Sequence, residues 1–135
     1  MSVVLCIDFG IKRCGLAISD ANRIIASPLQ TIPSESLETW LSLEIPKRQI
    51  AEIVIGYPTR LDGSDSHITE NVRLLKGALE KKYPALPIQL FDERYSSKMA
   101  SQAIALSGNK KKKQDKSLID QVAAALILQD FLSQS

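Results

Sequence analysis

Cysteine and histidine are scarce in this sequence. It contains two cysteines and one histidine among 135 residues, too few for a disulfide scaffold or for a zinc site built from Cys and His side chains. Cys6 and Cys14 both fall in predicted β-strands, so we expect them to be small core residues in a reducing compartment. His67 is expected to be a polar residue near the start of a helix.

Long hydrophobic runs are also missing. Residues 2–7 are apolar, but Asp8 ends this run well short of the ~20 residues that a membrane-spanning helix needs. The first residues do not resemble a signal peptide either. We therefore expect a cytoplasmic protein with no membrane partner.

Neither the charge nor the composition is extreme. The net charge of +2 is too small to indicate a nucleic-acid partner by itself. Hydrophobic residues make up 44% and charged residues 24% of the chain, values typical of folded proteins. Since the chain shows no internal repeat and no linker, we expect a single domain, residues 1–135, with its own core.

The pattern of apolar residues predicts an α/β fold. Three strands with short connections come first and suggest an antiparallel meander, in which Pro28 indicates an edge strand or a bulge. Helices and strands then alternate, and Pro46 is expected to end the first helix. The expected strands span residues 3–8, 15–19, 24–32, 52–58 and 88–91, and the expected helices span residues 34–43, 66–82, 96–106 and 117–132.

The order of these elements predicts one mixed five-stranded sheet, in which the antiparallel meander continues into parallel strands, with helices on both faces. The last helix is apolar on nearly every face, which is typical of a helix in the interior. Ligands of such sheets usually bind beyond the carboxyl ends of the parallel strands. The residues at these ends are therefore the first candidates for a functional site.

Three carboxylates are expected near these ends. Asp8 ends the first strand and, by the alternation of side chains, faces the same side as Cys6. Glu93 follows the fifth strand, and Asp120 leads into the apolar part of the last helix. Carboxylates this close together repel one another unless cations lie between them. Their convergence predicts a site for two Mg²⁺ or Mn²⁺ ions that hydrolyses a phosphodiester.

Each carboxylate also has an ordinary structural interpretation. Asp8 can accept hydrogen bonds from the turn that follows its strand. Glu93 can lie on the surface beside a helix N-cap at Asp92 or Ser96. Asp120 can belong to a capping box that begins at Ser117. The metal-site hypothesis therefore depends on the combination of the three and not on any one of them.

Four segments resemble the YqgF family, also called RuvX. They are DFGIKRCGLAISD (8–20), VIGYPTRLDGSDS (54–66), FDERYSS (91–97) and DQVAAALILQDFL (120–132). The resemblance runs nearly from end to end, and the family's members are described as Holliday junction resolvases and as nucleases that process the 5′ end of pre-16S ribosomal RNA. It implies a ribonuclease H-like fold, with catalytic, metal-binding acids at Asp8, Glu93 and Asp120. Ile11, where a small hydroxyl residue is common, and residues 95–97 depart from the family pattern without removing a metal ligand.

Several basic residues lie next to the expected acids. Lys12 and Arg13 follow Asp8, where they can meet backbone phosphates or simply be solvated at a turn. Arg94 can orient Glu93 or a phosphate, or form a surface ion pair. Lys111 and Lys112 belong to the lysine-rich segment 108–116, which we expect to bind phosphates at the rim of the site.

Together these patterns predict a hydrolase, a metal-dependent endonuclease that acts on nucleic acid. An RNA precursor as its substrate, in a pre-ribosomal particle, is implied by the family resemblance alone. One alternative is a resolvase of branched DNA, which requires a dimer because it cuts two strands symmetrically. Another is a catalytically silent nucleic-acid-binding module. We expect a monomer or a weak homodimer.

Overall fold

The structure, a computed structural model, describes residues 2–57, 67–92 and 116–134. Five strands form one sheet in the order β3-β2-β1-β4-β5. The strands are β1 (Val3–Asp8), β2 (Arg13–Ser19), β3 (Ala26–Pro33), β4 (Ile50–Tyr57) and β5 (Ile88–Asp92). The first three pair antiparallel, whereas β4 runs parallel to both β1 and β5. This arrangement confirms the predicted mixed sheet.

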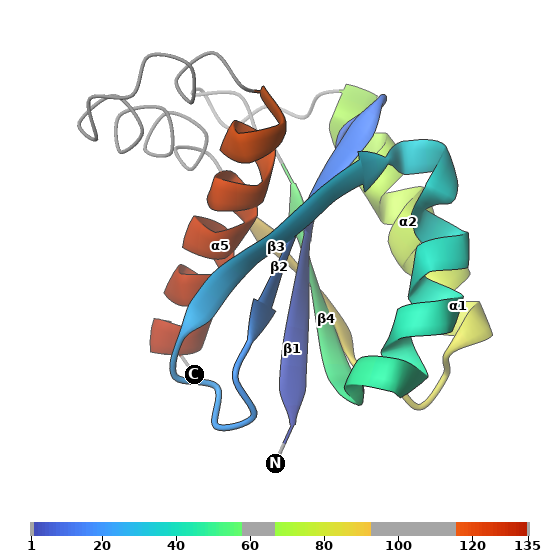
Figure 1. The fold of residues 1–135 in the computed structure, drawn as a ribbon. Helices are drawn as coiled ribbons and strands as arrows, with labels where there is room; N and C mark the ends of the chain where they lie inside the picture. Colours follow the sequence, from blue (N-terminus) through green and yellow to red (C-terminus); the bar gives the residue numbers. More distant parts are fainter. Residues whose placement is uncertain (1, 58–66, 93–115, 135) are drawn as a thin grey trace.

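Helices cover both faces of the sheet, as predicted. A 3₁₀ turn, η1 (Ser34–Ser36), leads into α1 (Leu37–Arg48), and the other helices described are α2 (His67–Lys82) and α5 (Lys116–Gln134). Figure 1 shows α5 on one face and α1 with α2 on the other. No helix in the described part of the chain is long and apolar enough to cross a membrane.

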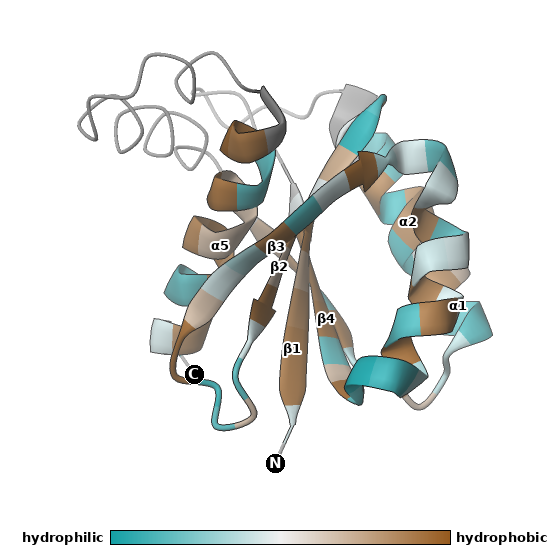
Figure 2. Cartoon of the chain, in the orientation of Figure 1, coloured by the Kyte–Doolittle hydropathy of each residue, from teal (hydrophilic) through white to brown (hydrophobic). Residues whose placement is uncertain are grey.

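Alternation along β1 divides the core into two layers. Leu5 and Ile7 are buried in the layer that includes α1 and α2, whereas Val4 and Cys6 are buried against α5. Figure 2 shows hydrophobic residues on β1 and β2, on α5, and on parts of α1 and α2. Asp8 has the same parity as Val4 and Cys6 and therefore belongs to the α5 side.

Pro28 behaves as predicted and Pro46 does not. The edge strand β3 shifts register beside Pro28. The prediction that Pro46 ends the first helix is wrong, since α1 continues through it to Arg48. Pro46 is exposed, so water can bind the carbonyl that its missing N–H leaves free. The helix ends instead at Gln49, which adopts the left-handed conformation with φ 55°.

The last helix is less buried than its composition predicted. Ala124, Ile127 and Leu128 of α5 are fully buried against the sheet. Asp130 and Ser133, by contrast, are exposed. The helix therefore covers one face of the sheet and leaves part of its own surface to solvent. The expected helix at residues 96–106 lies outside the described residues.

The backbone of α5 approaches the sheet most closely at Gly15. A Cβ atom placed on Gly15 would lie 2.1 Å from the carbonyl oxygen of Asp120 and 2.9 Å from the backbone nitrogen of Gln121. Real Cβ atoms do not tolerate such distances from backbone atoms, which cannot rotate away. The missing side chain of Gly15 thus fixes how near the first turns of α5 can come to β2.

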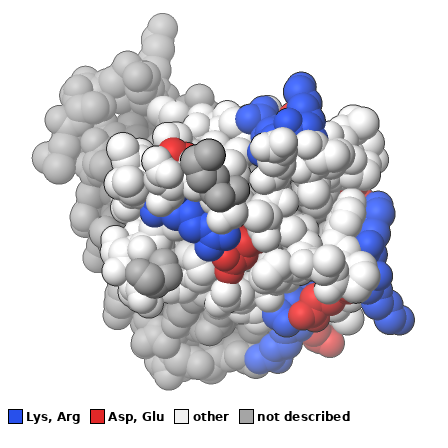
Figure 3. All heavy atoms as spheres, turned by 90° about the horizontal axis from the view of Figure 1, so that it is seen from below, with Lys and Arg blue, Asp and Glu red and all other residues white. Residues whose placement is uncertain are grey.

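A buried carboxylate at the amino ends of the parallel strands links neighbouring segments of the chain. Glu52 of β4 is only 6% exposed. Arg23 Nη1 donates to its Oε1 at 2.6 Å, and Gln89 Nε2 donates to its Oε2 at 2.5 Å. Arg23 also donates to the backbone and hydroxyl oxygens of Ser2. Figure 3 shows the molecule from this end, where charges of opposite sign lie beside one another.

Replacing Gly15 by alanine should destabilise the protein by about 3 kcal/mol, because α5 must move away from β2. Urea unfolding followed by circular dichroism measures this loss. Gly77→Ala is the matched control: a Cβ there meets no atom within 4 Å, and alanine should stabilise the exposed helix by about 0.5–1 kcal/mol. Equal effects of the two substitutions would contradict the close approach.

Replacing Arg23 by methionine should lower the free energy of unfolding by about 2–3 kcal/mol, since it leaves the buried Glu52 carboxylate without its cation. Lys76→Met is the control, because it removes an exposed pair with Glu80 within one helix and should cost less than ~0.5 kcal/mol. Both values come from the same urea titrations. If Arg23→Met lowers the free energy of unfolding no more than Lys76→Met does, the Arg23–Glu52 pair contributes no more to stability than an exposed ion pair.

Candidate metal and nucleic-acid site

Asp8 lies between two glycines at the carboxyl end of β1. In the sheet, its Cα is paired with Gly15 of β2 on one side and with Gly56 of β4 on the other. Neither of these directly paired neighbours has a side chain to compete for the space beside the Asp8 side chain. Asp92 ends β5 beside Tyr57, at this same edge. The parallel strands thus place their last residues at one edge, as the sequence predicted.

Asp120 is brought to the same place by α5. Its carbonyl lies over Gly15, the residue directly opposite Asp8. Asp8 and Gly15 point to the α5 side of the sheet, because residues paired in an antiparallel ladder share a face. The structure therefore brings Asp8 and Asp120 together across a glycine, although 112 positions separate them in the chain (120 minus 8).

Asp120 has a cationic partner in the structure. Arg13, the first residue of β2, donates from Nε to Asp120 Oδ2 in a direct ion pair. The two side chains are 38% and 28% exposed, so the pair sits at the border of the core. From the sequence, phosphates or solvent were the predicted partners of Arg13, and its partner Asp120 was missed. Because α5 begins at Lys116, Ser117 lies inside the helix and not at its cap.

The pKa of the Cys14 thiol is affected by the negative charges of this region. Burial raises the pKa of Cys14, and the negative charges of Asp8 and Asp120 raise the pKa further, while hydrogen bonds to Ser34 and the Gly10 backbone act in the opposite direction. A thiol with a raised pKa stays protonated at neutral pH, so Cys14 is not a nucleophile. Cys14 is thus the small buried residue that the sequence predicted.

The turn after β1 is fastened to η1. Ser34 Oγ donates to the carbonyl of Gly10 at 2.6 Å, and Ser34 N donates to the carbonyl of Lys12 at 3.0 Å. These bonds hold the Lys12 backbone beside the acids while leaving its side chain exposed. Sequence analysis treated Ser34 only as the start of a helix and missed this role. The signal available was a serine directly after a strand that ends in proline, a common turn sequence.

A hollow of about 260 Å³ adjoins this turn. Lys12 and Arg13 line one side of it, and Thr31, Ile32 and Pro33 of the edge strand line the other. Two cationic side chains beside an open hollow can contact backbone phosphates of a nucleic acid. Arg13 connects this hollow to Asp120, because it lines the hollow and forms the ion pair with Asp120.

The remaining predicted site residues are Glu93, Arg94, Lys111 and Lys112, and all four lie outside the described residues. Glu93 follows Asp92, the last residue of β5. In the described ranges 2–57, 67–92 and 116–134, no group of three potential metal ligands occurs. Asp8 and Asp120 are therefore the part of the predicted triad that the structure brings together.

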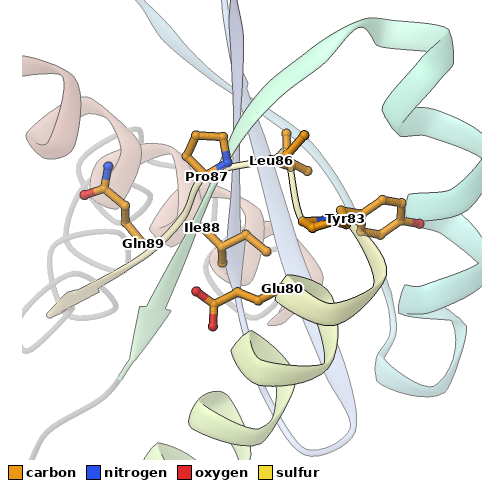
Figure 4. A pocket seen from close by; sticks show the side chains of 8 residues that line it. Glu80, Tyr83, Leu86, Pro87, Ile88 and Gln89 are labelled. Carbon is orange, nitrogen blue, oxygen red and sulfur yellow. The ribbon is translucent and has the colours of Figure 1, made fainter.

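A second hollow, of about 380 Å³, lies at the opposite end of the parallel strands, between α2 and β5. Its polar side chains diverge: Glu80 and Gln89 point to one side and the Tyr83 ring to the other (Figure 4). Lys76 already contacts Glu80, and Gln89 donates to Glu52. The candidate catalytic residues Asp8 and Asp120 therefore lie at the carboxyl ends of the strands and not at this second hollow.

Solved structures with a similar fold are known. The chain resembles Thermus thermophilus RuvC in complex with a Holliday junction substrate, with a TM-score of 0.60, 17% identity, and coverage of 99% of this chain and 96% of that one. A second T. thermophilus RuvC structure gives a TM-score of 0.57 at 14% identity, covering 98% and 95%. These similarities confirm the predicted ribonuclease H-like fold.

Sequence relatives cover the whole length. A protein of Phocaeicola vulgatus is 37% identical over 98% of this chain and 96% of its own, and one of Flavobacterium psychrophilum is 38% identical over 99% and 98%. Both carry the name "Putative pre-16S rRNA nuclease". The model of the RuvX family, described as Holliday junction resolvase, matches residues 2–134. The chain therefore belongs to the RuvX family, as its four sequence segments predicted.

Proposed function

We propose that this chain is a metal-dependent endonuclease of the cytoplasm that trims the 5′ end of pre-16S ribosomal RNA. The observation that carries the proposal is the position of Asp8 between Gly15 and Gly56, with Asp120 held across Gly15. This arrangement leaves space around two carboxylates at the edge of the sheet where ligands bind. Glu93, one residue beyond the end of β5, would complete the set.

The donor set fits Mg²⁺ or Mn²⁺. Carboxylate oxygens are hard ligands, and hard divalent cations take such ligands while retaining waters. The ion pair between Asp120 and the guanidinium of Arg13 supports this role, because Asp120 already faces a cation. Asp8, Glu93 and Asp120 would hold the metal ions. When bound, these ions supply an activated water and stabilise the leaving oxygen of the phosphodiester.

The basic residues supply the contacts to the substrate. Lys12 would meet a backbone phosphate at the mouth of the 260 Å³ hollow. Arg94 and the lysines at positions 111 and 112 would add contacts to the strand, which makes binding dependent on salt. The hydrogen bonds from Ser34 hold the backbone of the turn that carries Lys12. Phosphate contacts of this kind position a substrate, whereas they do not select its sequence.

An RNA precursor is the favoured substrate because the relatives that match nearly the whole chain are named "Putative pre-16S rRNA nuclease". A four-way DNA junction is the second candidate, favoured by the family description and by the fold shared with RuvC. Symmetric cleavage of a junction needs two active sites related by a twofold axis. The oligomeric state therefore helps to decide between the two substrates, because only a dimer can cut a junction symmetrically.

Asp8→Asn and Asp120→Asn should each reduce cleavage of a pre-16S RNA fragment in Mg²⁺ or Mn²⁺ by about 100-fold or more, because each removes a charged ligand of the metal ions. Initial rates on end-labelled RNA measure the effect. Asp130→Asn is the matched control, since Asp130 is an exposed aspartate of the same helix. Rates that fall equally in all three variants would point to a general loss of fold and count against these roles.

Wild-type protein should cut the RNA fragment at one position and leave a synthetic four-way DNA junction intact. Gel electrophoresis of both labelled substrates in parallel, with sedimentation velocity on the same protein, gives the comparison. Symmetric cuts in the junction by a dimer would replace the RNA proposal with the resolvase. Binding of RNA without cleavage by folded protein would instead support the silent binding module.

A further inference from the structure

We infer that Arg13 is an internal counter-cation that a divalent metal must displace from Asp120. This inference rests on the proposed function, because it assumes that Asp120 is a metal ligand. It deepens that function by giving Arg13 two alternating partners, a carboxylate before the metal binds and a phosphate afterwards. Arg13 is thus a positioning residue for the site.

The first argument is electrostatic. The backbone packing at Gly15 brings Asp120 to the level of Asp8, and both charges act on Cys14. Two carboxylates held this close destabilise each other unless a cation shields them. Arg13 supplies such a cation within hydrogen-bonding distance of Asp120 Oδ2. Arg13 therefore offsets part of the repulsion between the two acids in the folded protein before any metal arrives.

The second argument is competition for one oxygen. The Nε–H of Arg13 occupies a lone pair of Oδ2, one of the two oxygens through which Asp120 can bind a cation. A metal ion beside the same oxygen brings two positive charges close to the guanidinium, and these repel. Because both side chains are partly exposed, the guanidinium can leave Asp120 and remain hydrated. Metal binding should therefore break the pair.

The third argument concerns where the released guanidinium goes. Arg13 also lines the hollow that Lys12 and the edge strand form. A guanidinium that leaves Asp120 lies beside this hollow, and its planar fork binds phosphate oxygens in pairs. Metal binding would thus add a second cation to the phosphate-binding surface. The turn held by Ser34 does not need to move.

The comparison with Arg23 shows why the Arg13 pair can open. Glu52 is buried and accepts bonds from both Arg23 and Gln89. That arrangement holds the carboxylate through two separate elements, whereas the side chain of Asp120 is more exposed, 28% against 8% for Glu52. The ion pair of Arg23 with Glu52 therefore stabilises the fold, whereas the ion pair of Arg13 with Asp120 can open and let Arg13 change partners.

Calorimetric titration of Mn²⁺ into the full-length protein, freed of metal beforehand, tests the inference. Arg13→Gln should bind Mn²⁺ about three- to tenfold more tightly than wild type, as expected when a partly exposed ion pair no longer has to be broken. Lys12→Gln removes the same charge from the neighbouring position, where no contact with Asp120 is found, and should change the affinity less than about twofold. Thermal unfolding without metal checks that each variant is folded.

The outcomes separate the inference from the proposed function. Tighter binding by Arg13→Gln alone supports displacement. Equal tightening by both variants would show that only net charge matters, and unchanged or weaker binding by Arg13→Gln would show that Arg13 supports the metal-bound form; either result overturns the inference while the nuclease proposal stands. Absence of Mn²⁺ binding by wild type and by both variants would overturn the nuclease proposal and the inference together.

Discussion

The contact between the backbone of α5 and Gly15 is the constraint on which the proposed site depends. A helix that carries Asp120 can reach the strand opposite Asp8 only because no side chain stands at position 15. Gly56 leaves the other side of Asp8 open in the same way. Two glycines in one row of the sheet thus flank Asp8 at the strand end where the metal ions are proposed to bind.

Two arginine–carboxylate pairs at opposite ends of the sheet illustrate different uses of the same chemistry. At the amino ends of the parallel strands, Arg23 and Gln89 satisfy a buried carboxylate from separate elements and hold the sheet together. At the carboxyl ends, Arg13 meets the more exposed Asp120 beside a second acid. Burial makes the first pair costly to break, whereas exposure allows the second to exchange partners.

Much of the fold was predictable because alternation and turn residues act locally. The strand from Val3 to Asp8 was identified with its bounds, and the face of Asp8 followed from period-2 alternation. Pro46 misled the prediction because its local helix-breaking effect is offset by exposure to water near the helix end. The Arg13–Asp120 pair was not predictable, since it joins residues 107 apart through packing at Gly15.

An experimental structure of the protein soaked in Mn²⁺, with the metal located by anomalous scattering, is the most direct test of the account. We predict metal density in contact with the carboxylates of Asp8 and Asp120, and a guanidinium of Arg13 that has left Asp120 Oδ2. The account would be contradicted by a map in which Arg13 still contacts Asp120 and no metal lies at Asp8, in crystals of protein that cleaves its substrate.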